Sequence, residues 1–338
     1  MAAPVIAVDP LYTDAGDAER LVDLAHRFGR YRIYGEDEHI DLDIGRGLFP
    51  RHDSVQHFLR TGGARGPGAD VATLAARTSY FREEYAYDGA EHIGGVESFL
   101  HNPGLVRAAV DLYDRPIVEP AIAFANLMVP GQELAVHTDV PEFRGASRRN
   151  VPQWLLVVMH HSGLFDPWRL RIATGIAYFR DGEGGALRYW PDGPDGAPVV
   201  HPVRANTAVV LDTDSVFHGV DPVALEVEPP VVRPGAGLVA GDDGRWRLSD
   251  ADGAAVADYA WDDLRFSVSW KAYCFADEAK RTAWRDHTDD LTTEAVVSRL
   301  VDDMVDRGAA PADVPVDRAL GLRMIDEYVR YPGSPIPA

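Results

Sequence analysis

A histidine and an aspartate stand two positions apart in the stretch LAVHTDVPEF (134–143), directly after an apolar run. In an extended segment, residues i and i+2 project to the same face, so the side chains of His137 and Asp139 can point into one cavity. Two ligands hold a divalent metal poorly, and His218, which ends the strand-like run VVLDTDSVFH, is the candidate third. Two histidines and one carboxylate on one face of a metal leave three positions open, a donor set typical of non-haem iron(II) sites.

The strands that must position these residues are predicted in the middle third of the chain. Short β-rich runs from Ile117 onward are separated by Gly, Pro and Asp clusters such as RDGEGG and WPDGPDGAP. The pattern predicts strands within AIAFANLMV, QWLLVVMHH, RIATGIAYF, TAVVLDT and LRFSVSWKAYCF. Many short strands with turn residues between them favour a sandwich, a jelly roll or a barrel.

Helical patterns flank this β region on both sides. Before it, apolar residues at helical spacing occur in TDAGDAERLVDLAHRFGR, in 71–87 and in 102–113; after it, they occur in TTEAVVSRLVDDMVDR and VDRALGLRMIDEYV. The segment from about 224 to 263 carries the turn signals GDDG and DADG and is predicted to be an insertion with its own hairpins. The order of elements favours a single α+β domain over two independent ones.

Composition excludes several classes of protein. The chain has 338 residues, 46% of them hydrophobic, and a formal net charge of −20 with scattered Lys and Arg, so nucleic acid and anionic membrane surfaces are poor partners.

The single cysteine, Cys274, excludes an intrachain disulfide and a cysteine-based zinc finger, and it is expected to be a buried residue without a chemical role. No leader-like or membrane-spanning apolar segment is evident, so we expect a cytoplasmic protein. No feature of the sequence fixes an oligomeric state.

The middle of the chain resembles the Fe(II)/2-oxoglutarate-dependent dioxygenase superfamily, in particular its prolyl-hydroxylase-like branch. That branch orders an apolar strand, a Pro-Gly turn and H-x-D, then a Gly-Gly turn, an H-x-V-x-P-V-like stretch and a basic residue on the last core strand. This chain supplies NLMVPGQELAVHTD, TGIAYFRDGEGGALRYW, HPVRANTAVVLDTDSVFHGVDPV and LRFSVSW in that order. The resemblance covers about 116–275, roughly half of the chain.

The resemblance implies a fold and a division of the chain. It implies a double-stranded β-helix, that is, a jelly-roll or cupin-like core, flanked by N- and C-terminal helices. The single oxygenase domain would span 1–338. Within it, 1–115 would be a helical region, 116–275 the core with the insertion at about 224–263, and 276–338 a second helical region.

The resemblance also implies the cofactors and the residues that bind them. His137, Asp139 and His218 would hold Fe(II), at which O₂ and the cosubstrate 2-oxoglutarate react. The distal carboxylate of 2-oxoglutarate needs a cation, and the planar guanidinium of an arginine suits it better than lysine. Arg265 and Ser267 form an R-x-S pattern similar to the one that grips this carboxylate in other members.

Two assignments around the cosubstrate stay open at this point. Arg265 stands farther behind His218 than the corresponding arginine of compact members, so Arg233 in PPVVRPGAG is the alternative cation, although an inserted hairpin pair would explain the gap. Asn126 matches a position at which some relatives contact the cosubstrate with a polar side chain. A hydrogen bond at the strand end is the alternative role for Asn126.

The implied activity is the hydroxylation of an unactivated C–H bond, with desaturation or cyclisation as variants and with release of succinate and CO₂. Relatives that halogenate lack a carboxylate at the position of Asp139, so its presence favours hydroxylation. We expect a small-molecule substrate, such as an amino acid or a specialised metabolite, because no peptide-binding module or repeat is evident. A protein or peptide prolyl hydroxylase and a non-catalytic cupin-like metal- or sugar-binding jelly roll are the alternatives.

Several further residues near the motifs have two possible roles. Gly184-Gly185 is expected to be a structural turn, because no phosphate-loop pattern surrounds it. Trp190 either walls the site or packs in the core. The remaining candidates are two histidines expected to be structural and three loop arginines that either hold an acidic group of the substrate or are solvated: His160, His161, Arg144, Arg148 and Arg149.

Overall fold

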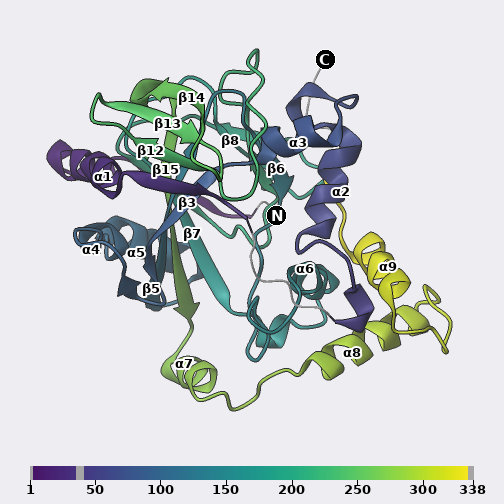
Figure 1. Cartoon of the computed structure of the whole chain (residues 1–338). Helices are drawn as coiled ribbons and strands as arrows, with labels where there is room; N and C mark the ends of the chain where they lie inside the picture. The colour runs from purple at the N-terminus through teal and green to yellow at the C-terminus, as the bar shows by residue number, and fades with distance from the viewer. Residues whose placement is uncertain (1–2, 36–41, 334–338) are drawn as a thin grey trace.

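Two antiparallel sheets form the centre of the protein in the computed structural model, which describes residues 3–35 and 42–333 (Figure 1). The larger sheet has eleven strands among the described residues and the smaller sheet has four. In spatial order the larger sheet contains β1 (Val5–Val8), β10 (Thr207–Leu211), β7 (Arg171–Tyr178), β15 (Arg265–Phe275), β5 (Ile117–Met128), β3 (Phe81–Tyr87), β2 (Arg30–Ile33), β12 (Gly237–Ala240), β13 (Arg245–Ser249) and β14 (Ala255–Ala260), with β4 (Ala90–Glu91) on β3. The smaller sheet contains β6 (Leu134–His137), β11 (His218–Val220), β8 (Leu187–Tyr189) and β9 (Val199–His201).

The path of the chain through these sheets is that of a double-stranded β-helix. From β5 the chain alternates between the sheets: β6 is in the smaller, β7 in the larger, β8 and β9 in the smaller, β10 in the larger, β11 in the smaller and β15 in the larger. Two facing sheets built in this way make a jelly roll. The predicted α+β class with a jelly-roll core between N- and C-terminal helices is therefore confirmed.

Strand β15 lies in the middle of the larger sheet, between β5 and β7, and has two faces of opposite character. Side chains of a strand alternate between the faces of its sheet. The even-numbered residues are buried in the main apolar core: Phe266, Val268, Trp270, Ala272 and Cys274. The odd-numbered residues at its beginning line a cavity between the two sheets: Arg265, Ser267, Ser269 and Lys271.

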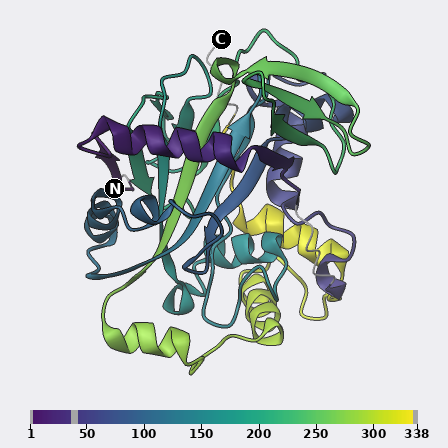
Figure 2. The same ribbon diagram turned by 60° about the vertical axis from the view of Figure 1, so that its left-hand side comes forward.

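Three helices cover the outer face of the larger sheet (Figures 1 and 2). They are α1 (Ala15–Phe28), α4 (Glu97–Leu100) and α5 (Pro103–Tyr113). Leu24, Phe99 and Leu105 bring one apolar face from each of them into the core that contains Trp270. In Figure 2, α1 runs across the strands of the sheet.

A second apolar core lies on the other side of the cavity. It joins α6 (Gln153–Ser162), α8 (Thr293–Asp306) and α9 (Arg318–Tyr328) through buried residues such as Trp154, Leu300 and Met324. Helices α2 (His52–Thr61) and α3 (Val71–Thr78) contact β6 of the smaller sheet, and α7 (Glu278–Arg285) follows β15. None of the helices in the described ranges is long and apolar enough to cross a membrane.

The prediction of a strand in QWLLVVMHH is wrong, because this segment forms α6. Every residue from Gln153 to Met159 is buried, so the run is apolar nearly all round and has no period that separates helix from strand. Pro152 precedes the helix, and Gly163 ends it in the left-handed conformation (φ 70°). Proline near the start and glycine after the end are both typical of a helix.

The prediction of a helical first third is only partly correct. Helices α1 and α5 occupy the predicted segments, but the pattern at 71–87 divides into α3 and β3. Tyr80 and Phe81 stand at that division, and aromatic residues favour strands. The short strands β1 and β2 also join the larger sheet, so this region supports the core directly.

The segment 224–263, predicted to be an insertion, contains two β-hairpins. GDDG (241–244) joins β12 to β13, and DADG (250–253) joins β13 to β14. Because β12 pairs with β2, the insertion extends the larger sheet at one edge.

Candidate metal centre and cosubstrate pocket

His137, Asp139 and His218 come together on the smaller sheet. His137 ends β6 and His218 begins β11, and the two are direct partners in the antiparallel register. Asp139 follows β6 by two residues, where its backbone N–H donates to the carbonyl of Thr213 (2.8 Å). Asp139 Oδ1 lies 3.5 Å from His137 Nε2 and 3.7 Å from His218 Nε2. One donor atom from each of the three residues lies within 4.8 Å of the other two.

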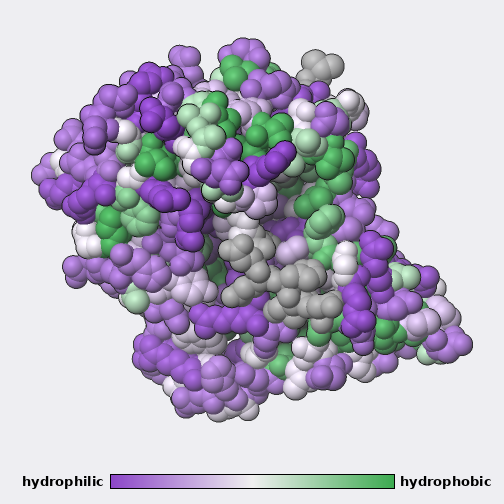
Figure 3. All heavy atoms as spheres, in the orientation of Figure 1, coloured by the Kyte–Doolittle hydropathy of each residue, from purple (hydrophilic) through white to green (hydrophobic). Residues whose placement is uncertain are grey.

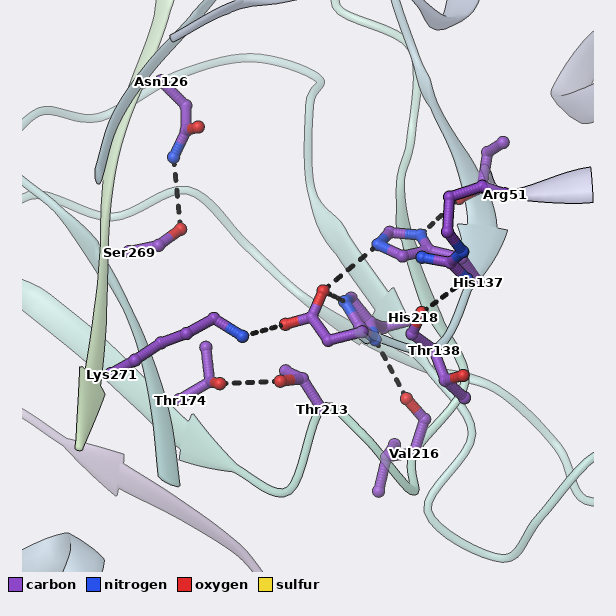
Figure 4. A network of polar contacts seen from close by, with 12 residues as sticks. Arg51, Asn126, His137, Thr138, Thr174, Thr213, Val216, His218, Ser269 and Lys271 are labelled. Atoms are coloured by element: carbon purple, nitrogen blue, oxygen red, sulfur yellow. Dashed lines mark hydrogen bonds and ion pairs between the residues drawn. The ribbon is translucent and has the colours of Figure 1, made fainter. Parts of the chain in front are cut away.

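Both imidazole rings are oriented by the backbone. Nδ1 of His137 lies 2.7 Å from the carbonyl oxygen of Ala135, and Nδ1 of His218 lies 2.9 Å from that of Val216. A carbonyl can only accept, so each Nδ1 carries a proton, and in the neutral form of either ring Nε2 has the lone pair that can bind a metal. Metal-binding histidines commonly have such a partner, because it fixes the tautomer and the ring orientation. Figure 4 shows the two rings pointing toward the same region, with Lys271 opposite.

Lys271 on β15 holds the second oxygen of the Asp139 carboxylate. Its Nζ lies 2.6 Å from Asp139 Oδ2. Burial by itself raises the pKa of this carboxyl, but the Lys271 ammonium and the two histidines outweigh burial and hold the pKa well below its usual range. The carboxylate is therefore ionised at neutral pH, with Oδ1 left to face the histidines.

The protonation states of this cluster fit a divalent cation. Burial, together with the neighbouring His137, lowers the pKa of His218 to about 3, so that ring is neutral at pH 7. Metal ligands must be deprotonated, and a neutral imidazole with an ionised carboxylate meets that requirement. The donor set of two imidazole nitrogens and one carboxylate oxygen suits Fe(II) and leaves coordination positions open.

The cluster lines a cavity of about 440 Å³ between the two sheets. The cavity is walled by residues of β5, β7 and β15 on one side and of β6, β8 and β11 on the other. Phe49, Leu59 and Val71 at its rim are among the exposed large hydrophobic residues of the protein. In Figure 3, hydrophobic side chains gather around a hollow beside α2 and α3.

Arg265 opens β15 and reaches into the same cavity. It is 6% exposed, and its guanidinium donates to the Gly185 carbonyl (Nε, 2.6 Å), to Ser267 Oγ (Nη1, 2.9 Å) and to Tyr178 Oη (Nη2, 3.2 Å). Among the described residues, no carboxylate pairs with this buried cation. A buried charge without a counter-charge is costly, so the site is suited to an anion.

The Gly184-Gly185 turn is part of the support of Arg265. Both glycines have positive φ (78° and 62°), and a Cβ on Gly185 would lie 2.5 Å from Arg265 Cδ. The turn is structural, as the sequence predicts, and in addition its second residue makes room for the arginine and accepts its hydrogen bond. The sequence could not reveal this contact, because the two residues are 80 positions apart.

Asn126 lies beside Ser267 on the neighbouring strand β5. Its Nδ2 donates to Ser269 Oγ (3.1 Å), which Figure 4 shows, and its Oδ1 accepts from Arg82 Nε (2.8 Å). The side chain lines the cavity and also ties three strands together. Its Nδ2 also donates to the Phe124 carbonyl (3.2 Å), so the hydrogen-bonding role considered for Asn126 is present, and its contact with the cosubstrate stays a prediction.

The alternative candidates Arg233, Trp190, His160 and His161, and the cysteine Cys274, do not line the cavity that contains the cluster. Arg233 is exposed and does not line the cavity, unlike Arg265. Trp190 is buried in the second apolar core, as are the residues around His160 and His161 on α6. Cys274 is buried, as predicted, and burial raises its pKa to about 12.

The three loop arginines have different environments. Arg144 pairs with Asp289 (2.6 Å), and the side chain of Arg149 is 64% exposed. Arg148 lines the cavity. Only one of the three is therefore placed to meet a ligand in the cavity.

Three residues that shape the pocket are not among those predicted from the sequence. Lys271 contacts Asp139, and Tyr178 contacts Arg265. Arg82 lines the cavity from β3. A signal existed for Lys271, because R-x-S-x-S-x-K repeats a polar residue at every second position of RFSVSWK and so marks one face of the strand. No comparable signal pointed to Arg82, because its segment was assigned to a helix.

No protein-family model matches the chain. The tRNA N6-adenosine threonylcarbamoyltransferase of Methanococcoides burtonii is 34% identical over 146 residues, which cover 40% of this chain and 38% of that protein. Because the chain spans well under half of that relative, we infer no activity from it.

Solved structures similar to this chain are 2-oxoglutarate–Fe(II) oxygenases, including prolyl hydroxylases. The α-ketoglutarate-dependent epimerase SnoN from nogalamycin biosynthesis is 12% identical with a TM-score of 0.41, over 81% of this chain and 79% of that chain. A Pseudomonas putida prolyl-4-hydroxylase is 12% identical with a TM-score of 0.38, over 82% and 95%. HygX of Streptomyces hygroscopicus, solved with nickel, 2-oxoglutarate and hygromycin B, is 9% identical with a TM-score of 0.39, over 81% and 83%.

The predicted resemblance is confirmed at the level of the fold by the strand order, and the three residues of the H-x-D…H pattern lie together as expected. Metal binding by these residues stays a prediction. At such low identities and TM-scores, we take neither substrate nor activity from the solved structures.

Proposed function

We propose that this protein is a non-haem Fe(II)- and 2-oxoglutarate-dependent oxygenase that hydroxylates an unactivated C–H bond of a small molecule. Desaturation and cyclisation are variants of the same chemistry. The observation that supports this proposal best is that one cavity is lined both by the His137–Asp139–His218 cluster and by Arg265, a buried cation without a carboxylate partner among the described residues.

The proposed roles follow from the contacts of each residue. His137, Asp139 and His218 would hold Fe(II), with Lys271 keeping Asp139 ionised and turned toward the histidines. The bound iron supplies the oxidising chemistry in which O₂ and 2-oxoglutarate yield succinate and CO₂, one oxygen atom entering succinate and the other the product hydroxyl. The carboxylate of Asp139 fills the position that halogenating relatives leave open.

Arg265 and Ser267 would bind the distal carboxylate of 2-oxoglutarate. Three of the five N–H donors of the guanidinium are taken by protein oxygens and a fourth, on Nη1, by Met128 Sδ (3.9 Å), which fixes its plane and leaves one donor on Nη2. The Ser267 hydroxyl accepts from Arg265, so its own proton can be donated to the same carboxylate. Asn126 would contact the cosubstrate from the adjacent strand.

The size of the cavity favours a small-molecule substrate over the alternatives. At about 440 Å³ it lies in the range of small-molecule sites, roughly 300–1,000 Å³. A non-catalytic jelly roll would not need a buried arginine facing the metal ligands. An extended peptide substrate would need a groove beyond this cavity.

The test is spectroscopic. Anaerobic addition of Fe(II) and 2-oxoglutarate should produce the weak visible charge-transfer band of the chelate, and admission of O₂ should yield succinate. Arg265→Gln should retain iron and lose the band, whereas Arg233→Gln, which changes an exposed arginine by the same charge, should retain both. His218→Ala should lose the iron.

Three results would contradict the proposal. The absence of the band in the unmodified protein would exclude 2-oxoglutarate chelation. An unchanged band in Arg265→Gln would remove the cosubstrate assignment. Unchanged iron content in His218→Ala would remove the triad.

A further inference from the structure

The cavity is cationic although the whole chain carries a formal charge of −20. Among the described residues that line it, Asp139 is the one carboxylate. Five basic residues line it as well: Arg51, Arg82, Arg148, Arg265 and Lys271. The dianionic cosubstrate of the proposed function would offset only part of this charge, and a bound Fe(II) would add to it.

Most of these cations already have an assigned partner. Arg51 pairs with the buried Asp53 (3.2 Å), and Lys271 pairs with Asp139. Arg265 is assigned above to the cosubstrate. Arg82 is different, because in the described parts of the chain no carboxylate pairs with it and its one hydrogen bond joins Nε to Asn126 Oδ1 (2.8 Å).

Aromatic rings hold the Arg82 guanidinium in a defined orientation. Its central carbon lies 4.4 Å from the ring centroid of Tyr34, 5.1 Å from that of Tyr80 and 4.7 Å from that of Phe124. Cation–π contacts of this kind cover the faces of the guanidinium and leave its edges for hydrogen bonds. The Nε edge reaches Asn126, while Nη1 and Nη2 hydrogen-bond to no residue in 3–35 or 42–333.

Arg82 stands close to the cosubstrate site on the same face of the larger sheet. It is paired with Asn126 on β5, and Asn126 is paired with Ser267 on β15. Neighbouring strands are about 4.8 Å apart, so Arg82 is roughly 10 Å from Ser267 along this row. A second anion can therefore bind at Arg82 without displacing a carboxylate from Arg265.

We propose that Arg82 binds a carboxylate of the substrate, so that the substrates of this site are small carboxylic acids. This inference rests on the proposed oxygenase function. An arginine with its terminal nitrogens free binds a planar carboxylate bidentately, which fixes the orientation of the ligand as well as its affinity. The apolar rim of the cavity suits the remainder of such a molecule.

The test uses 3-phenylpropanoate, a carboxylate on an apolar body, and its uncharged amide of the same shape. Each is titrated calorimetrically, under anaerobic conditions, into the protein loaded with Fe(II) and 2-oxoglutarate. The acid should bind saturably and the amide roughly tenfold or more weakly, because charge-assisted hydrogen bonds are lost. Arg82→Gln should weaken binding of the acid by a similar factor, and Arg82→Lys by an intermediate one.

Arg247→Gln is the matched control, because Arg247 lies on β13 and does not line the cavity. Its substitution changes the net charge of the protein by the same amount as Arg82→Gln. It should leave binding of the acid unchanged. The inference is overturned by equal affinities for acid and amide, by unaltered binding in both Arg82 variants, by an equal loss in Arg247→Gln, or by no saturable binding up to about 50 mM acid.

The two proposals can fail separately in this experiment. If the unmodified protein forms no charge-transfer band with Fe(II) and 2-oxoglutarate, the oxygenase function fails, and titration of the acid into the metal-free protein still tests Arg82. If the band forms in the unmodified protein and in Arg82→Gln alike while both bind the acid equally, only the substrate class fails.

Discussion

Substitution of Gly185 by alanine is expected to weaken 2-oxoglutarate binding through displacement of Arg265. The added Cβ would lie 2.5 Å from Arg265 Cδ, whereas carbon atoms in ordinary contact are about 3.5–4.0 Å apart. The arginine must therefore move by about 1 Å or the turn must open. Either change disrupts the 2.6 Å hydrogen bond from Arg265 Nε to the Gly185 carbonyl.

The size of the effect follows from that hydrogen bond and from the backbone. A hydrogen bond to a charged group contributes about 1.5–3 kcal/mol, and about 1.4 kcal/mol corresponds to a tenfold change in affinity. Gly185→Ala should thus raise the Kd for 2-oxoglutarate by roughly 10- to 100-fold. The left-handed conformation (φ 62°) should also lower the free energy of unfolding by about 1–2 kcal/mol.

Gly184→Ala is the matched control. Gly184 also has a positive φ (78°), and its added Cβ would meet the Pro222 carbonyl oxygen at 2.8 Å, but it does not contact Arg265. Both variants should lose stability in thermal unfolding of the metal-free protein. Only Gly185→Ala should require more 2-oxoglutarate to develop the charge-transfer band at a fixed Fe(II) concentration.

Two outcomes would refute the reasoning. If Gly185→Ala binds 2-oxoglutarate as tightly as the unmodified protein, the close approach of Gly185 does not position Arg265 for this ligand. If both variants lose the same affinity, the effect comes from the strained turn and not from the arginine.

Three further perturbations test other parts of the structure. Tyr178→Phe removes the hydroxyl that accepts from Arg265 Nη2 (3.2 Å) and should weaken 2-oxoglutarate binding by about 3- to 10-fold without loss of iron, measured by titration of the same band. Phe266→Ala empties a fully buried position on the core face of β15 and should lower the free energy of unfolding in urea by about 3–5 kcal/mol. Burial lowers the pKa of His161 to about 4, so the neutral ring supports the fold fully above the unfolded pKa near 6.5, and that support declines as the pH falls toward 4. His161→Gln should therefore reduce the loss of unfolding free energy between pH 7 and pH 5 by about 2 kcal/mol, and an unchanged loss would contradict the assigned pKa.

The candidate metal cluster could be predicted in part from the sequence because the spacing of two of its residues is local. His137 and Asp139 are two residues apart on an extended segment, and this spacing alone places both side chains on one face. His218 could be added because it ends a strand-like run just before a turn, and because the family resemblance implies a histidine at this point in the order of motifs. The structure brings His137 and His218 into direct register, which no local pattern could show.

The errors arose where local patterns are ambiguous or where contacts are distant. QWLLVVMHH is apolar enough for a buried strand, but tertiary packing among α8, α9 and the loop after β6 makes it a buried helix. The position of Arg82 depends on β3 pairing with β5, a contact between segments 44 residues apart at Asn126. Neither the pairing nor the aromatic rings around Arg82 follow from the order of residues.

The choice between Arg233 and Arg265 shows why separation in sequence says little about separation in space. The closure of a loop costs only about 0.6 kcal/mol more for each doubling of its length, so a long insertion between β11 and β15 is tolerated. The strands β12–β14 extend the edge of the larger sheet, where β12 pairs with β2. The chain then returns to form β15, the strand between β5 and β7. A double-stranded β-helix needs a strand at that place, and its first residue is Arg265. Arg233 belongs to the connection that leads to the insertion, so the closure of the sheet, not the distance from His218, decides which arginine faces the metal ligands.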